Sequence, residues 1–450
     1  MSIKILLVGA GEVGFNLARY LSKENYDITV IDNNSDKCNR IKNTIDAHVI
    51  EGDGASQRIY ENIDMQSIDY FLPLTRHDEV NLVASKIAKK LGVKKIISRL
   101  RNTEYIHKNA ILKPEEFNID YVTYPEKAAQ IEIESLVKQT SAVEVQEFES
   151  NLITLIGIKL EVSSPLVGRA VKNVYLSNPF TPHICAVIYR NDESFVPHKN
   201  TIYKKNDVVY FVVDTDLVDD VQKMAGKPPF KVKNIMILGL GKIARLLAKS
   251  LQYDYNVKIV EKESYKAKKY SSTLEESLIL VGDGLDHELL ESENIHDIDC
   301  FIATTENEKT NMLASLIVKH HGVKQVIMHI STTDYIKSVR TIGVDAVVSK
   351  NISAVNEVLK IIQTNQEEIE ISRFEDIDID SLEITVKENC KYFTRNYSID
   401  DIPESICLSA ISRNNKVFIP NNSKIHIEPN DKLLIFLKPE TISKAESLFL

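Results

Sequence analysis

The sequence predicts an α/β protein with two doubly wound parallel sheets, each followed by a small, β-rich α+β module. Two observations support this prediction. Short apolar runs alternate with helical patterns along the 450-residue chain, and landmarks of the first half return in the second half in the same order. Strands that are apolar on both faces suit a parallel sheet covered by helices, and strand–helix alternation at this spacing is typical of a doubly wound sheet.

The first sheet is expected to contain six short apolar strands, at residues 3–8, 27–32, 47–52, 70–75, 95–100 and 120–125. Helical patterns separate them. Val13, Leu17 and Leu21 recur at the spacing of one helix face, and a second helix is expected over 81–91. A further helix over 125–140 would lead from the sheet to the small module.

Three landmarks return 230 positions later, which predicts a duplicated unit. They are VGAGEVG at 8–14 and LGLGKIA at 238–244, EGDG at 51–54 and VGDG at 281–284, and the segments 81–97 and 311–327. The ends of the two halves repeat more faintly, with Asp207 opposite Asp431. The segment 226–233 contains two prolines and is expected to link the halves.

These patterns predict four domains. The large, nucleotide-binding domains are expected over 1–124 and 232–355, and the small modules over 141–225 and 366–450.

Composition excludes several classes of protein. A net charge of −9 argues against nucleic-acid binding and against a polybasic membrane anchor. No apolar run reaches the ~18–20 residues that a membrane-spanning helix needs. The five cysteines form no C-x-x-C pair, which suits a reducing cytoplasm and indicates no zinc site. We therefore expect a soluble cytoplasmic protein whose connection to a membrane, if it has one, runs through a partner.

The opening glycine turn predicts a dinucleotide site. Gly9 permits the tight turn, Gly11 lets the backbone approach a pyrophosphate, and Gly14 lets helix and strand pack closely. The following helix offers its N-terminal N–H groups to phosphates. Asp32 ends the second strand, where a carboxylate binds ribose hydroxyls and repels a 2′-phosphate, so NAD(H) or an adenine nucleotide is favoured over NADP(H). The alternative is a glycine turn with a purely structural role.

Further candidates follow the other strands of the first sheet. Asp53 lies in the GDG turn, where the alternative is a turn-forming role, and it returns as Asp283. Thr75 and Arg76 follow the fourth strand. Arg99 follows the fifth and offers a planar fork for phosphate, with a surface salt bridge as its alternative.

The second copy differs at several of these positions. Its turn runs from Gly239 to Ala244, Glu261 replaces the ribose-binding Asp and is followed by Lys262, and His329 replaces Arg99. We expect a second site with weaker or different preference. The alternative is a site that survives only as scaffold.

No catalytic set accompanies the nucleotide turns. The small modules contain no Ser/His/Asp spacing and no metal-binding cluster, and no ligand spacing predicts a metal site elsewhere. His183, His198 and His426 are expected in structural or exposed positions, and Cys185 and Cys407 in buried packing. Two nucleotide sites without catalytic residues favour a sensor that converts ligand occupancy into domain movement.

The order of these motifs resembles the TrkA-type peripheral subunits of Trk potassium uptake systems, which carry tandem RCK (KTN) domains. The order is a glycine turn, an acid after the second strand, GDG, T-x-x-D/E-x-x-N after the fourth strand and a small module, all duplicated. The resemblance covers essentially the whole chain. It implies an integral membrane potassium-translocating partner, NAD(H) or ATP/ADP as regulatory ligands, and four copies in a ring on the inner face of the membrane.

The resemblance also implies a set of nucleotide contacts. They map onto Gly9, Ala10, Gly11, Glu12, Val13, Asp32, Asp53, Thr75, Arg76 and Arg99 in the first half, and onto Gly239, Leu240, Gly241, Lys242, Ile243, Glu261, Asp283 and Thr305 in the second.

Two other functions remain open at this point. An NAD-dependent oxidoreductase with unusual small domains would show substrate-dependent turnover of the cofactor. A nucleotide sensor for a different transporter would share every motif, because the same domain type regulates several transporters.

Overall fold

A computed structural model describes residues 3–22, 26–102, 104–107, 109–149, 151–332, 336, 339, 343–364, 369–374, 377–420 and 425–450. The predicted domain start at 366 lies outside these residues. The chain forms two compact units. The first is built on the N-terminal parallel sheet and includes Ser349–Ile362, and the second holds the other parallel sheet and both small modules.

The first sheet has six strands in the order β3-β2-β1-β4-β5-β6, as expected for a doubly wound fold. The strands are β1 (Ile3–Val8), β2 (Tyr26–Asp32), β3 (His48–Glu51), β4 (Tyr70–Pro73), β5 (Lys95–Arg99) and β6 (Tyr121–Thr123). Its helices are α1 (Glu12–Leu21), α2 (Ser35–Thr44) and α3 (Asp78–Lys90), and α4 (Pro125–Lys138) follows. The strand order reverses between β1 and β4, where doubly wound folds bind ligands at the carboxyl ends of their strands.

The second sheet repeats this order as β14-β13-β12-β15-β16-β17. Its strands are β12 (Asn234–Leu238), β13 (Asn256–Glu261), β14 (Ser277–Val281), β15 (Cys300–Ala303), β16 (Gln325–Ile330) and β17 (Ala346–Ser349). Its helices are α7 (Lys242–Leu251), α8 (Ser264–Tyr270), α9 (His287–Ser292) and α10 (Glu308–His320), and α12 (Lys350–Thr364) follows. The fold class predicted from the sequence is confirmed.

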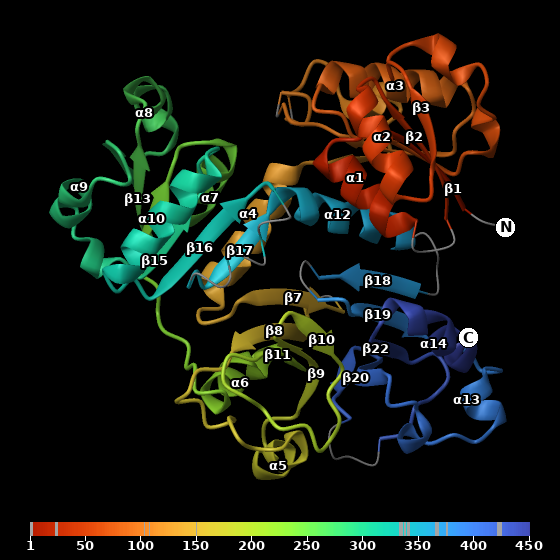
Figure 1. Cartoon of the computed structure of the whole chain (residues 1–450), viewed down its shortest axis with the longest axis vertical. Coiled ribbons are helices and arrows are strands. Elements are labelled where there is room, and N and C mark those ends of the chain that lie inside the picture. Colours follow the sequence, from red (N-terminus) through yellow and green to blue (C-terminus); the bar gives the residue numbers. More distant parts are fainter. Residues whose placement is uncertain are drawn as a thin grey trace. The chain divides into compact units, whose positions relative to one another are not determined.

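The helix that follows the second sheet completes the core of the first unit. Ala354, Val358 and Ile362 of α12 join the apolar cluster formed by Ile5 and Leu7 of β1. The ribbon of α12 runs alongside the first sheet (Figure 1). The Tyr70 hydroxyl donates to the carbonyl of Ile362 over 3.2 Å. The sequence pattern shows that α12 is amphipathic but does not show which sheet covers its apolar face.

The small modules are two five-stranded antiparallel sheets with one topology, β10-β9-β11-β8-β7 and β21-β20-β22-β19-β18. The first has β7 (Glu144–Phe148), β8 (Ile153–Lys159), β9 (His183–Arg190), β10 (Glu193–Phe195), β11 (Val208–Asp214), α5 (Val171–Ser177) and α6 (Val218–Met224). The second has β18 (Ile369–Arg373), β19 (Asp380–Thr385), β20 (Ile406–Arg413), β21 (Lys416–Phe418), β22 (Lys432–Leu437), α13 (Lys391–Thr394) and α14 (Ile442–Phe449). The pairing of β11 with β9 and that of β22 with β20 each contain a register shift, so the two modules share even this irregularity.

A bidentate ion pair recurs at the same place in both modules. Arg190 holds the fully buried carboxylate of Asp207 through two contacts of 2.7 Å, and Arg413 holds Asp431 at 2.7 and 2.8 Å. Each carboxylate also accepts a backbone N–H, from Lys204 in the first case. The correspondence of Asp207 and Asp431 in the sequence therefore reflects one buried interaction.

No helix in the described part of the chain is long and apolar enough to cross a membrane.

Removing the Asp207 carboxylate should destabilise the first small module. Asp207→Ala leaves the Arg190 guanidinium without its anion, and breaking a buried pair in this way costs about 3–5 kcal/mol. Unfolding of the full chain in urea, monitored by circular dichroism, is the measurement. One of its transitions should have its midpoint at a clearly lower urea concentration in the variant than in the wild type. Glu193→Ala, at an exposed position in the same module, is the control. Equal midpoints for the two variants would contradict the role given to the pair.

Glu357 of α12 should make the stability of the first unit depend on pH. Its Oε2 accepts from the Thr123 hydroxyl over 2.6 Å, and burial raises its pKa above the usual value. The folded state then holds the proton to higher pH than the unfolded chain. The resulting stability is present below the unfolded pKa of about 4.3 and is lost as pH rises through the folded pKa.

Glu357→Gln removes this loss, because the amide does not ionise. The thermal midpoint of the variant should exceed that of the wild type at neutral pH, and the difference should shrink towards pH 4. A difference that stays constant across this range would show that Glu357 does not titrate as stated.

Candidate functional site

Backbone conformation or packing requires glycine at two of the three glycine positions in the opening turn, and not at the third. Gly9 has φ +107°, and a Cβ on Gly14 would lie 1.9 Å from the Gly9 carbonyl oxygen, so both are required by the fold. Gly11 has φ −70°, and a Cβ there would meet nothing within 4 Å. In the second copy, a Cβ on Gly241 would have its nearest neighbour, the Thr304 carbonyl oxygen, at 3.7 Å. Both turns thus leave open space beside the glycine that the sequence analysis assigned to pyrophosphate.

The N-termini of α1 and α7 face this space without a side-chain cap. Gly11 and Gly241 are the N-cap residues, and neither helix end has a side-chain cap hydrogen bond. The first N–H groups of a helix carry partial positive charge and bind anions. The first turn differs between the copies, because Glu12, paired with Arg40 at 3.4 Å, is replaced by Lys242.

The acid that ends the second strand of each sheet holds the glycine turn in place. Asp32 is buried and accepts the Ala10 N–H at 2.6 Å and the Asn34 N–H at 2.8 Å. Glu261 accepts the Leu240 and Glu263 N–H groups, both at 2.8 Å. Glu261 therefore takes the place of Asp32. A carboxylate oxygen has a further lone pair for a ribose hydroxyl.

Thr75 and Thr305 take part in matching hydrogen-bond networks within their own loops. The Thr75 hydroxyl donates to the Asn81 side-chain oxygen over 2.7 Å, and Thr305 donates to Asn311 over 2.6 Å. The amide of Asn81 also donates to the Arg99 carbonyl over 2.8 Å, which joins the loops after β4 and β5. The threonines are predicted from the sequence, whereas Asn81, the last residue of the T-x-x-D/E-x-x-N pattern, is not among the predicted site residues.

Asp78 in the same pattern anchors the loop after β5. It is buried and accepts the N–H groups of Arg101 and Asn102, at 2.6 to 3.0 Å. It also begins α3, three residues before the predicted start at 81, because acidic residues favour the first turn of a helix.

Arg99 is a half-buried cation at the carboxyl end of the sheet. Its Nε atom is buried without a hydrogen-bond partner, and burial lowers the pKa of the guanidinium. An unpaired buried donor is costly, and an anionic ligand would satisfy it. Arg76 is exposed, with its Nε 3.1 Å from His77 Nε2. In the second copy, the buried His329 stands at the position of Arg99.

The GDG turns differ through a lysine. Asp53 accepts the Ala55 N–H at 2.9 Å and is exposed. Asp283 accepts the Leu285 N–H at 3.0 Å and also pairs with Lys262 at 2.9 Å, which lowers the Asp283 pKa. The second copy therefore places an added cation between the ends of β13 and β14.

The histidines and cysteines of the small modules lie apart from any reactive arrangement that the structure describes. His183 is fully buried, with Nδ1 2.7 Å from the Thr181 carbonyl, and burial lowers its pKa. Burial raises the pKa of Cys185 and raises that of Cys407 to about 11, so both stay thiols at neutral pH. His198 pairs with Glu404 at the surface.

The family model described as the TrkA-N domain matches residues 5–125 and 235–350, which are the two parallel-sheet regions. The chain belongs to the TrkA-N domain family. Its relatives include the Trk system potassium uptake protein TrkA of Vibrio alginolyticus, 29% identical over 99% of this chain and 98% of that protein. A Methanosarcina mazei protein, Trk system potassium uptake protein trkA homolog 1, is 31% identical over 80% of this chain and 89% of its own.

Solved structures show the same fold. The GsuK RCK domain aligns over 99% of this chain and 94% of its own with a TM-score of 0.60 at 14% identity. The GsuK channel bound to NAD aligns over 100% of this chain and 79% of its own with a TM-score of 0.59 at 13% identity. The family model and the TrkA relatives confirm the family resemblance inferred from the motif order.

The Asp32 hydrogen bonds predict different outcomes for two substitutions. Asp32→Ala leaves the buried Ala10 N–H without its acceptor, which costs about 1–3 kcal/mol. Asp32→Asn keeps one acceptor oxygen for the Ala10 N–H and loses only the acceptor for the Asn34 N–H, so it should lose less stability than Asp32→Ala. Thermal unfolding of the full chain without ligand is the measurement. Equal loss in both variants would show that the negative charge, rather than the acceptor, holds the turn.

Proposed function

We propose that the chain is a nucleotide-sensing regulatory subunit of a Trk-type potassium uptake system. It acts on an integral membrane potassium-translocating subunit and lies in the cytoplasm, peripherally on the inner face of the membrane. The observation that carries the proposal is similarity along the whole chain: relatives named Trk system potassium uptake protein TrkA match 99% of it. This similarity includes the small modules, which the TrkA-N family model does not cover.

The regulatory ligand is NAD(H), ATP or ADP. Three features of the first copy support a nucleotide: the open side of Gly11, the uncapped start of α1 and the unpaired Nε of Arg99. The Asp32 carboxylate disfavours a 2′-phosphate. A solved channel with this fold is bound to NAD. The second copy binds with a different preference, because Lys242, Lys262 and His329 change its charge.

Ligand occupancy would act by shifting a conformational equilibrium. The candidate contacts come from the ends of five strands, β1 to β5, so a bound nucleotide would touch several loops at once. A ligand shifts an equilibrium only by its difference in affinity for the two states. Exchange between two nucleotides that close these loops to different extents would supply that difference without turnover.

The proposal extends to assembly and domain organisation. Four copies of a two-repeat chain would form a ring that carries eight nucleotide domains. The four domains keep the bounds 1–124, 141–225, 232–355 and 366–450, and their role is regulatory rather than enzymatic.

Gly11→Val tests the nucleotide site. The φ of −70° suits any residue and a Cβ at this position would meet nothing within 4 Å, so the variant should fold as the wild type does. Its side chain would fill the volume assigned to the pyrophosphate. Calorimetric titration of the full chain with NADH, NAD, ATP and ADP should show a loss of at least ~100-fold in affinity for the nucleotide that the first site binds, about 2.7 kcal/mol.

Gly241→Val makes the matched change in the second copy and should affect only the second site. Wild-type affinity in Gly11→Val would contradict the placement of the pyrophosphate. Steady oxidation of NADH with a small substrate would contradict the regulatory role. Copurification with a membrane subunit and loss of potassium-dependent growth on deletion test the transport partner.

A further inference from the structure

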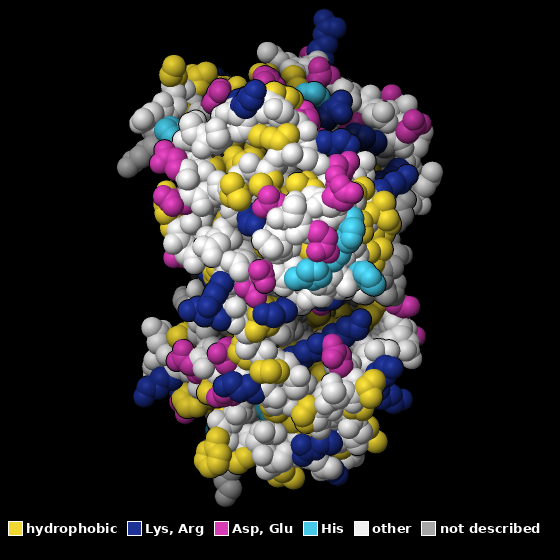
Figure 2. All heavy atoms as spheres, turned by 90° about the vertical axis from the view of Figure 1, so that its left-hand side faces the viewer, with side chains coloured by type: hydrophobic (Ala, Val, Ile, Leu, Met, Phe, Trp, Pro, Cys, Tyr) yellow, Lys and Arg dark blue, Asp and Glu magenta, His cyan; other side chains and the backbone are white. Residues whose placement is uncertain are grey.

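A group of histidines lies on the surface of the second parallel-sheet domain. Four of the eleven histidines occur at the start of α9, in the turn after it and at the C-terminal end of α10; they are His287, His296, His320 and His321. Figure 2 shows histidine side chains gathered on one face with acidic side chains beside them. Neither the nucleotide site nor the proposed function uses them.

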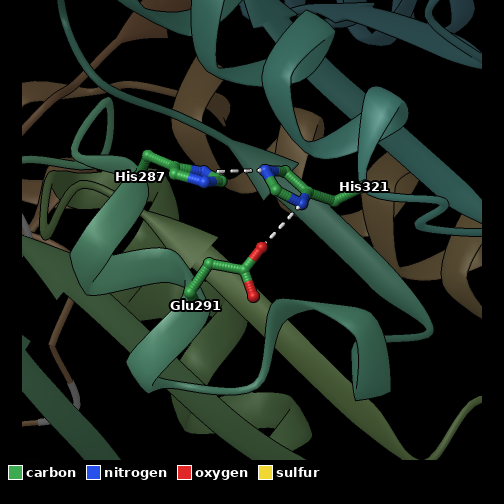
Figure 3. A group of neighbouring side chains, drawn as sticks. All are labelled: His287, Glu291 and His321. Carbon is green, nitrogen blue, oxygen red and sulfur yellow. Dashed lines mark hydrogen bonds and ion pairs between the residues drawn. The ribbon is translucent and has the colours of Figure 1, made fainter.

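Two imidazoles and a carboxylate of this group converge (Figure 3). His287 Nδ1 lies 3.2 Å from His321 Nε2, and His321 Nδ1 lies 3.1 Å from Glu291 Oε1. One ligand atom from each of the three residues lies within 4.8 Å of the others. His287 and Glu291 are four positions apart on α9, which places them on one face of the helix.

We propose that His287, Glu291 and His321 bind a transition-metal dication of the Zn²⁺ type. Imidazole nitrogen with one carboxylate oxygen suits Zn²⁺, Ni²⁺ or Cu²⁺, whereas Mg²⁺ and Ca²⁺ prefer oxygen alone. With metal–nitrogen bonds of about 2.0 Å, two ligands of a tetrahedral ion lie about 3.3 Å apart. His287 Nδ1 and His321 Nε2, which are 3.2 Å apart, come close to this value, and Glu291, now paired with the other nitrogen of His321, would turn to the same side to complete the set.

The side chains have the freedom and the support that such a site needs. His287 and Glu291 are exposed and would close on an ion by rotation, whereas His321 is largely covered and fixes the position. His296 contacts two of these residues, with Nε2 3.2 Å from Glu291 Oε1 and Nδ1 2.9 Å from the His321 carbonyl oxygen. Outer contacts of this kind orient metal ligands.

The first repeat shows that the fold does not require these histidines. The residues 230 positions earlier are Gln57, Glu61, Gln66, Lys90 and Leu91. The acid is present in both copies, but the first sheet forms with the same strand order and none of the histidines. The group is therefore a feature added to one copy of a duplicated domain.

The test is calorimetric titration of the metal-stripped, nucleotide-free full chain with ZnCl₂. We expect one Zn²⁺ per chain in the wild type. His287→Gln introduces the residue of the first repeat and should weaken binding by at least ~10-fold, and Glu291→Gln should weaken it similarly. His426→Gln removes an exposed histidine of the second small module and should leave the affinity unchanged.

Thermal unfolding gives a second measurement. Zn²⁺ should raise the unfolding midpoint of the wild type and of His426→Gln but not that of His287→Gln, because an ion that binds only the folded state stabilises it. Equal midpoints of the three proteins without metal confirm that the variants fold. A wild type that binds no Zn²⁺, or His287→Gln with unchanged affinity and stoichiometry, would overturn the proposal. None of these changes touches the nucleotide sites.

Discussion

The carboxylate at the end of the second strand is the constraint on which each parallel-sheet domain depends. It accepts a backbone N–H from the glycine turn across the gap between neighbouring strands, at Ala10 in one copy and Leu240 in the other. The bond fixes the turn in the shape that exposes the helix N-terminus. A turn without this acceptor would have a buried donor to satisfy and no fixed position for a ligand. In the proposed function, folding and ligand recognition therefore depend on the same carboxylate.

The two copies meet this constraint with different side chains. The second copy has one residue fewer between the glycine turn and the end of its second strand, and it uses Glu261 in place of Asp32. Each carboxylate also accepts the N–H two residues further along the chain. The hydrogen-bond pattern is thus preserved while the side chain changes length. Residue identity alone would suggest a lost interaction, whereas the geometry shows that the hydrogen bonds to the turn are retained.

Much of the fold was predictable from the sequence, because buried parallel strands read as apolar runs and duplication repeats their spacing. β1 has the predicted bounds, and the predicted strand over 120–125 shortens to Tyr121–Thr123. The packing of α12 on the first sheet was not predictable, since an apolar helix face does not specify its partner. The roles of Asp78 and Asn81 were missed because hydrogen bonds between loops leave no periodic pattern.

The histidine group was missed for a similar reason. His287 and Glu291 have helical spacing, but His321 lies 34 positions from His287 and is brought near only by the packing of the domain. A comparison of the two copies would have revealed the group. The second copy has histidines at the positions of Gln57 and Leu91, and it keeps the acid of Glu61. In a duplicated chain, two copies can have the same strand order and different residues at a given position. The shared fold then does not require either residue at that position. A group of metal-binding side chains at such positions therefore needs an explanation other than folding, and the proposed ion, specific to the second copy, supplies it.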